Sequence, residues 1–222
     1  MTEDRKKLYP ESKVELTPFV ARHYDRLLNL ISLGFYGRFI ARAIEELSLA
    51  AGDSILDLGC GTGRNASLML EKLGPAGKIK GLDLLPEMQE QFEKRFEKEP
   101  RVTFRRQRID VAFDLGEKFD LVFISFVLHG FPPAVREIIL DNAVRHLKPG
   151  GRLAILDYAE FNLEDKGFLF RWVFNKFECT YARDFIQYDW KKILGECGFR
   201  VEGEEYYFRN IIRLLRARLK GD

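Results

Sequence analysis

The stretch ILDLGCGTGRNA, residues 55–66, decides the fold of this chain. Three alternate glycines, Gly59, Gly61 and Gly63, follow an apolar run, and Asp57 stands two residues ahead of the first of them. Glycine allows a tight turn and lets a ligand approach the backbone, because no Cβ stands in the way. An apolar strand, a glycine-rich turn and a helix in this order indicate a nucleotide-like ligand.

Around this stretch the hydrophobic pattern alternates between strand-like and helix-like segments. Short apolar runs bounded by turn residues predict strands, and apolar positions at i, i+3, i+4 and i+7 predict helices. This alternation predicts a parallel α/β sheet with helices on both faces. We expect strands at 54–58, 78–83, 102–107, 119–125 and 152–158, and helices at 36–47, 65–73, from Pro86 onward, 135–147 and 190–197.

The segment NIIRLLRARLK, residues 210–220, is ambiguous. Leu214, Leu215 and Leu219 share one face of a helix, yet the same apolar runs suit a strand. The chain has no repeat and no Pro/Gly/Ser-rich linker, so the simplest organisation is a single domain.

Composition and charge argue against several classes of protein. The formal net charge of +2 is too small to imply a nucleic-acid partner, and the three cysteines form no CxxC pair. The N-terminal MTEDRKKLYPESK lacks the apolar segment of a secretory signal, and no stretch approaches the about 18 apolar residues of a membrane span. We therefore expect a cytoplasmic protein.

Two ligand classes can be fitted to the glycine turn. The dinucleotide fingerprint can be read from Gly61 through Gly63 to Ala66, but this reading leaves Asp57 unexplained. A carboxylate beneath the turn suits an ammonium group better than a pyrophosphate. Asp83 ends the next predicted strand, about 20 residues beyond the turn, where an acidic side chain binds ribose hydroxyls.

A third carboxylate completes the pattern. Asp110 follows the third predicted strand and could accept a hydrogen bond from the adenine amine, although Asp114 in the same RIDVAFDL segment is an alternative. Such a site calls for adenosine with a ribose diol and a positively charged amino-acid tail. The predicted cofactor is therefore S-adenosylmethionine.

Ordered motifs resemble those of class I S-adenosylmethionine-dependent methyltransferases. They are LDLGCGTG (56–63), GLDLLPEM (81–88), FDLVFISFVLHGF (119–131) and LKPGGRLAILDY (147–158). HYDRLLNLISLG (23–34) is similar to the N-terminal signature of the ubiquinone/menaquinone C-methyltransferase branch. The resemblance implies a doubly wound, Rossmann-like sheet of seven strands in the order 3-2-1-4-5-7-6, the last antiparallel, and hence a strand at 210–219.

The resemblance also divides the single methyltransferase domain and assigns roles to residues. We expect a helical N-terminal cap (1–50), a cofactor-binding core (51–160) and an acceptor-side insertion with the last strands (161–222). Asp57 and the glycine backbone would hold the methionine part, and Asp83 would hold the ribose. The cofactor-binding residues expected are Asp57, Gly59, Cys60, Gly61, Gly63, Asp83, Leu84, Met88, Asp110, Val111, Ser125 and Tyr24. Met88 would pack on the adenine, and Ser125 would lie beside the methionine portion.

His129 is the candidate general base. It lies just beyond the carboxyl end of a predicted strand, where catalytic groups of this architecture gather, and imidazole accepts a proton near neutral pH. A histidine that only walls the pocket or bonds a loop is the alternative. Methyl transfer from a sulfonium needs alignment and a dry site rather than a metal, and the three histidines and three cysteines are not spaced as metal ligands.

The aromatic segment GFLFRWVFNKFECTYARDF, residues 167–185, is the candidate acceptor side. We expect Phe168, Trp172 and Tyr181 to line, with His129, a pocket for a small or lipophilic acceptor, such as a quinone precursor or a phospholipid-headgroup amine. A helix packed on the sheet or on a partner subunit is the alternative. Basic residues beside the aromatic ones would permit peripheral contact with the inner face of an anionic membrane.

Three other functions compete with methyl transfer to such an acceptor. A nucleic-acid methyltransferase is disfavoured, because the charge is nearly balanced and SFVLHGFPP lacks the Asn/Asp-Pro-Pro-aromatic motif of amino-directed enzymes. The glycine spacing disfavours an NAD-dependent oxidoreductase. A non-catalytic protein that binds S-adenosylmethionine stays open, as does the choice between monomer and homodimer.

Overall fold

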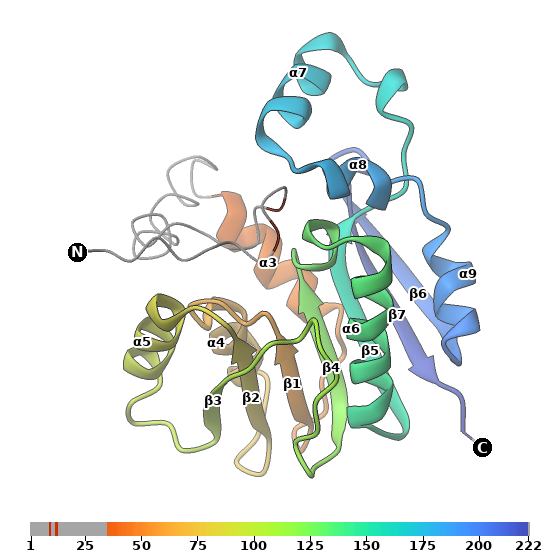
Figure 1. Cartoon of the computed structure of the whole chain (residues 1–222). Helices are drawn as coiled ribbons and strands as arrows, with labels where there is room; N and C mark the ends of the chain where they lie inside the picture. Colours follow the sequence, from red (N-terminus) through yellow and green to blue (C-terminus); the bar gives the residue numbers. More distant parts are fainter. Residues whose placement is uncertain (1–8, 10–11, 13–34, 222) are drawn as a thin grey trace.

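The computed structural model describes residues 9, 12 and 35–221. In this part of the chain seven strands form one sheet in the order β3-β2-β1-β4-β5-β7-β6 (Figure 1). The pairs from β3 to β5 are parallel, whereas β7 is antiparallel to both β5 and β6. The predicted strand order and the antiparallel last strand are confirmed. The strands are β1 Ser54–Leu58, β2 Lys78–Asp83, β3 Val102–Arg106, β4 Phe119–Ser125, β5 Leu147–Tyr158, β6 Phe199–Tyr207 and β7 Ile212–Leu219.

Helices cover both faces of the sheet (Figure 1). None of the helices in the described ranges is long and apolar enough to span a bilayer. The helices are α3 Phe35–Glu45, α4 Arg64–Leu70, α5 Pro86–Arg95, α6 Pro133–His146, α7 Phe168–Phe177, α8 Thr180–Phe185 and α9 Trp190–Glu196, with single 3₁₀ turns η1 Leu128–Gly130 and η2 Leu163–Asp165.

The alternation of side chains along β4 divides the core into two clusters. Val122 points to the face covered by α6, α8 and α9, where it belongs with Ile139 and Leu140 of α6 to one buried cluster. Phe123 points to the opposite face and belongs with Ile44 of α3 and the inner side chains of α4 and α5 to the other. The central strands are therefore buried on both sides, as parallel strands between two helical layers are.

The boundary between α6 and β5 differs from the prediction. We expected the helix to include Leu147 and the strand to begin at Arg152, but α6 ends at His146 and β5 begins at Leu147. Leu147 pairs with Phe119 of β4 ahead of an irregularity in the register. Pro149 explains the change, because a proline and the residue before it favour extended backbone.

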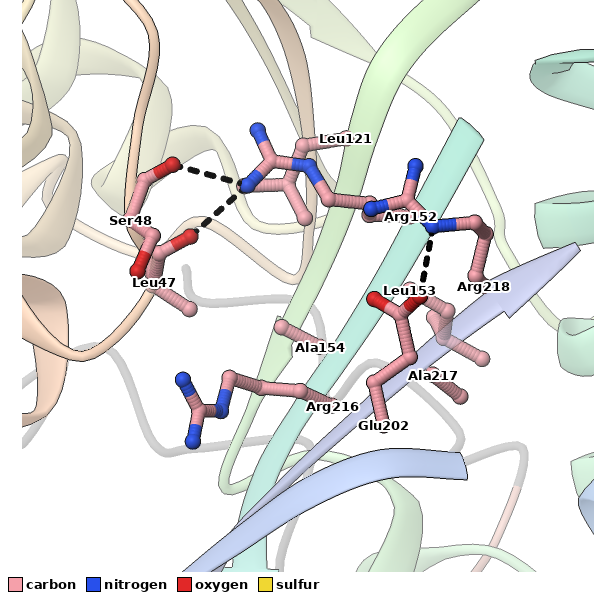
Figure 2. Close-up of a pocket in the computed structure, with 10 residues that line it drawn as sticks. All are labelled: Leu47, Ser48, Leu121, Arg152, Leu153, Ala154, Glu202, Arg216, Ala217 and Arg218. Carbon is pink, nitrogen blue, oxygen red and sulfur yellow. Dashed lines mark hydrogen bonds and ion pairs between the residues drawn. The ribbon is translucent and has the colours of Figure 1, made fainter. Parts of the chain in front are cut away.

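An arginine-lined pocket of about 160 Å³ lies on the α3 side of the sheet, away from the carboxyl ends of the strands. Arg152 donates to the carbonyls of Leu47 and Ser48, and Arg216 donates to that of Glu46. These hydrogen bonds tie the chain that follows α3 to β5 and β7, so we assign the arginines a structural role. Figure 2 shows the lining residues Leu47, Ser48, Leu121, Arg152, Leu153, Ala154, Glu202, Arg216, Ala217 and Arg218.

Candidate active site

The turn between β1 and α4 has backbone geometry that requires glycine. Gly59, Gly61 and Gly63 have φ angles of 77°, 53° and 77°, a region that other residues rarely adopt. A Cβ at Gly59 would lie 2.4 Å from a methyl group of Val127, and one at Gly63 would lie 2.6 Å from the ring of Phe96. A Cβ at Gly61 would meet no atom closer than 4.0 Å. Packing therefore demands the outer two glycines, and the middle one leaves room for a ligand against the backbone.

Asp83, at the end of β2, holds this turn in place. One carboxylate oxygen accepts a hydrogen bond from the backbone N–H of Gly61 at 3.0 Å, and the other accepts from Leu84 at 2.7 Å and Leu85 at 3.1 Å. Burial raises the pKa of Asp83, and these hydrogen bonds oppose that shift. The sequence predicted a ligand role for Asp83 but did not reveal this second role, in which the side chain joins β2 to the glycine turn.

Two side-chain oxygen atoms on the strands beside the turn are buried with no hydrogen-bond partner. They are Oδ2 of Asp57, on β1, and Oγ of Ser125, at the end of the neighbouring strand β4. Asp57 is 1% exposed, and burial together with the nearby Asp83 carboxylate raises its pKa to about 8. Buried polar groups in native proteins are nearly always paired. These two atoms therefore mark a place where a ligand would supply the missing partners.

The carboxylate of Asp110, expected at the adenine, is already engaged by the protein. Arg108 donates to it from Nε at 3.1 Å and Nη2 at 2.8 Å, and the hydroxyl of Tyr9 donates at 2.7 Å. Burial raises the pKa of Asp110, but these hydrogen bonds outweigh burial and leave the pKa below its usual value. The neighbouring Val111 is 37% exposed, whereas Met88 is buried at the N-terminal turn of α5.

The other residues expected at the cofactor lie as follows. Cys60 is a buried residue of the glycine turn, and Leu84 is half-buried at the end of β2. Tyr24 lies outside the described residues. The structure thus gathers the turn, Asp83, Asp57 and Ser125 at the carboxyl ends of adjacent parallel strands, where ligands of open α/β sheets bind.

His129 lies in the 3₁₀ turn that follows β4, and a buried carboxylate orients it. Its Nδ1 is 2.7 Å from Oδ1 of Asp157, which is 1% exposed near the end of β5. A carboxylate only accepts, so we place the ring proton on Nδ1, and this leaves Nε2 free of a proton in the neutral form. A carboxylate-oriented imidazole whose second nitrogen can accept a proton is the arrangement of a general base.

Two further polar groups face His129. Oε2 of Glu178 is 3.8 Å from Nε2, and the hydroxyl of Tyr158 donates to Glu178 at 2.8 Å. The rings of Tyr158 and His129 meet edge to face with centroids 5.2 Å apart. Burial lowers the pKa of His129, but Asp157 and Glu178 raise it more, so the pKa lies above its ordinary value. The two carboxylates therefore stabilise the imidazolium that forms once His129 takes a proton.

Sequence reasoning missed Asp157, Tyr158 and Glu178. Asp157 and Tyr158 end the quoted LKPGGRLAILDY motif, so their position at the carboxyl end of a predicted strand was an available signal. Glu178 lies between α7 and α8, and nothing in the surrounding sequence indicates that it faces His129.

The aromatic residues expected around the acceptor do not lie together: two are exposed on α7, and the third is half-buried on α8. Phe168 and Trp172 lie on the outer side of α7, where they are 76% and 48% exposed. Tyr181 is half-buried, and its backbone carbonyl accepts a hydrogen bond from Arg136. Phe174 of α7 reaches inward instead, with its ring 5.4 Å from that of Tyr158.

The raised pKa of Asp57 predicts a pH-dependent effect of Asp57→Asn on the cofactor-free protein. The folded state keeps a proton on Asp57 up to about pH 8, whereas the unfolded chain releases it near pH 3.8. Stability from this proton is complete below the unfolded pKa and is lost as the pH rises through the folded value. An asparagine at position 57 does not ionise, so the variant does not lose stability in this way as the pH rises. Urea denaturation should therefore show that Asp57→Asn stabilises the protein more, relative to wild type, at pH 9 than at pH 6; an equal difference would contradict the assignment.

Comparison with known proteins identifies the family. The family described as "Methyltransferase domain" matches residues 55–151. Demethylmenaquinone methyltransferase of Lactobacillus johnsonii is 34% identical over 68% of this chain and 63% of its own length. The chloroplastic 2-phytyl-1,4-beta-naphthoquinone methyltransferase of Arabidopsis thaliana is 32% identical over 69% of this chain and 60% of its own. The chain thus spans under two thirds of the length of these two relatives.

A third relative is covered more fully. Demethylmenaquinone methyltransferase of Lactiplantibacillus plantarum is 30% identical over 75% of this chain and 70% of its own length. The chain belongs to the class I S-adenosylmethionine-dependent methyltransferases. The resemblance of this chain to the ubiquinone/menaquinone branch, predicted from its motifs, is confirmed by these relatives.

The solved structures agree with this family at the level of the fold. A crystal structure of an S-adenosylmethionine-dependent methyltransferase from Aquifex aeolicus matches with a TM-score of 0.62 and 21% identity over 81% of this chain and 89% of that chain. The cofactor of the class is S-adenosylmethionine. The site in this chain fits this cofactor, because the glycine turn leaves room beside its backbone and the unpartnered Asp57 and Ser125 atoms lie at the adjoining strand ends.

Proposed function

We propose that this methyltransferase transfers a methyl group from S-adenosylmethionine to the ring of a quinone-type acceptor that carries an apolar tail. The observation that supports this best is the buried His129–Asp157 pair beside an aromatic cluster, at the carboxyl edge that also carries the glycine turn. The acceptor class comes from the relatives, which are named for demethylmenaquinone and for a phytyl naphthoquinone.

On the cofactor side, S-adenosylmethionine supplies an activated methyl group on a sulfonium. Asp57 and the backbone at Gly61 would hold the methionine portion, and Ser125 would supply a further hydrogen bond there. Asp83 would accept from the ribose hydroxyls with the lone pairs that its three backbone hydrogen bonds leave. Asp110 would contact the adenine amine through the lone pair of Oδ1 that Arg108 leaves free.

On the acceptor side, His129 would act as the general base. The dihydroxy form of a quinone ring becomes nucleophilic at carbon when a hydroxyl group loses its proton, and Nε2 of His129 would accept that proton. Asp157 holds the imidazole in the required tautomer, and Glu178 stabilises the charge that results. The bond from the methyl group to the ring carbon would then form as the bond to sulfur breaks. The same ring carbon would lose its hydrogen as a proton while the oxygen regains one, which restores the aromatic ring. One proton in net would pass by way of His129 to solvent.

Aromatic side chains beside His129 would receive the apolar acceptor. Tyr158 touches His129 on one side and Phe174 on the other, and Phe174 in turn meets Phe161 and Phe170 with ring centroids about 6.0 Å apart. Such a cluster excludes water from the reacting atoms. Because the acceptor dissolves in lipid, we place the working protein at the inner membrane face.

The test has two stages. Calorimetry with S-adenosylmethionine and with NAD should give binding of the first only; binding of NAD alone would overturn the cofactor assignment. Incubation with methyl-labelled cofactor and a reduced naphthoquinone with a prenyl tail should then place label in a lipid-soluble product. Label in phospholipid, RNA or protein instead, with none in the quinone, would reject the proposed acceptor.

A further inference from the structure

Helix α7 exposes large apolar side chains to solvent. Phe168, Leu169, Trp172 and Val173 are 76%, 71%, 48% and 40% exposed, and they make up most of the large apolar residues that the described chain leaves exposed. Figure 1 shows α7 standing beyond the carboxyl edge of the sheet, apart from the helices that cover its faces. Contiguous exposed apolar surface of this kind marks an interaction site rather than a core.

The helix has two apolar faces, and the described part of the chain packs on only one of them. Phe170 and Phe174 point inward and pack on Phe161, and Phe174 is 4% exposed. The outer face, which we define as Phe168, Leu169, Trp172 and Val173, needs no contact with the sheet. A surface helix of a globular protein normally carries polar residues there.

Basic residues accompany the outer face. The sequence of α7 contains Arg171 and Lys176 and no acidic residue, and Lys166 precedes it by two positions. Arg171 forms a salt bridge with Glu164, which with Asp165 precedes Lys166, so Lys176 is the basic residue that lies directly on the outer face. The ammonium of Lys176 lies 4.7 Å from the centre of the Trp172 ring. Exposed aromatic and aliphatic residues with lysine or arginine beside them are typical of helices that lie in the interface of anionic membranes.

We propose that the outer face of α7 docks this protein on an anionic lipid bilayer. The occupant is a membrane and not a protein partner, because the basic side chains of α7 complement anionic headgroups and its exposed aromatic and aliphatic side chains suit the bilayer interface. This inference rests on the proposed function for its purpose, since a tailed quinone resides in the bilayer. The inner face of α7 connects the docked helix to the site, because the ring of Phe174 contacts that of Tyr158 and the ring of Tyr158 contacts that of His129.

The chain carries its own probe for this contact. It has two tryptophans, of which Trp190 is 2% exposed in the core and Trp172 is 48% exposed on the outer face. Vesicles of equal parts phosphatidylcholine and phosphatidylglycerol should shift the fluorescence to shorter wavelength, and brominated lipids should quench it. Phosphatidylcholine vesicles should give at least tenfold weaker binding, and salt should weaken binding to the anionic vesicles.

The variant Leu169→Gln/Val173→Gln tests the face without touching residues assigned to the site. It should bind anionic vesicles at least tenfold more weakly, whereas Tyr206→Ser, at a 45% exposed position on β6, should bind like wild type. Thermal melting and cofactor calorimetry verify that both variants fold. Equal binding by wild type and the double variant, or no binding of wild type to anionic vesicles, would overturn the proposal. So would a dimer in solution that the double variant converts to monomer.

The vesicle measurements need no turnover, so they distinguish this proposal from the proposed function. If the protein methylates a quinone, the double variant should keep its rate with detergent-dispersed acceptor and lose at least tenfold with acceptor embedded in anionic vesicles. Vesicle binding without quinone methylation would reject the acceptor and leave the docking surface standing.

Discussion

Replacement of His129 by glutamine should lower kcat for methyl transfer by about 100- to 10,000-fold, the usual contribution of a positioned general base. Glutamine keeps much of the volume of the side chain but cannot take a proton near neutral pH. The affinity for S-adenosylmethionine should stay within about threefold, because His129 lies on the acceptor side. Single-turnover kinetics with labelled cofactor, combined with calorimetry, separate the two quantities.

Asp157→Asn and His146→Gln are the matched variants for this experiment. Asparagine can accept from Nδ1 but removes the charge, so kcat should fall and the pKa of His129 should drop. His129 must be neutral to act, so the rate of the wild type should rise with pH around the pKa of His129, which lies above 6.5. Asp157→Asn should shift this rise in rate to lower pH. His146 is also buried, but it is the last residue of α6, where it forms hydrogen bonds with the carbonyl of Asn142 and the backbone N–H of Leu115 rather than with His129. A loss of rate in His146→Gln as large as in His129→Gln would show that general disruption, not base catalysis, is measured.

Replacement of Asp83 by alanine should weaken the binding of S-adenosylmethionine by at least 100-fold, which corresponds to about 2.8 kcal/mol. The substitution removes the proposed contact with the ribose. It also removes the acceptor for the backbone N–H groups of Gly61, Leu84 and Leu85, so the glycine turn loses its tie to β2. Isothermal titration calorimetry measures the dissociation constant directly.

Two control variants sharpen the result for Asp83. Asp83→Asn keeps acceptor capacity and should lose less affinity than alanine does. Asp114, the alternative adenine ligand, has a side chain that is 78% exposed and accepts from Gly116 within its own loop, so Asp114→Ala should bind the cofactor like wild type. An affinity of Asp83→Ala within threefold of wild type would refute its role, and a large loss in Asp114→Ala would favour Asp114 as the adenine ligand.

Most of the sheet could be predicted from short-range patterns. The bounds of β1, β2 and β4 agree with the predicted strands, and β3 differs by one residue. Their pattern is strong because each strand is apolar and bounded by turn residues. The patterns failed where one residue fits two adjacent elements. Leu147 continues the apolar stripe of α6, but in the structure it pairs with β4 as the first residue of β5. Residues 212–219 needed the family resemblance, because their apolar runs suit a helix as well as a strand.

The sequence by itself determined the glycine turn and the carboxylate at the end of β2. The turn follows from local backbone geometry, because φ above zero favours glycine. The position of the carboxylate follows from the α/β pattern, because parallel strands bring their carboxyl ends to one edge of the sheet. Only the tertiary structure decided what surrounds His129. Asp157 comes from a strand 28 residues away, and Glu178 from a connection after α7. Likewise, only packing separated the inner from the outer aromatic residues of α7. Periodicity describes neighbours along the chain, whereas these contacts depend on strand order and on the path of the connections between elements.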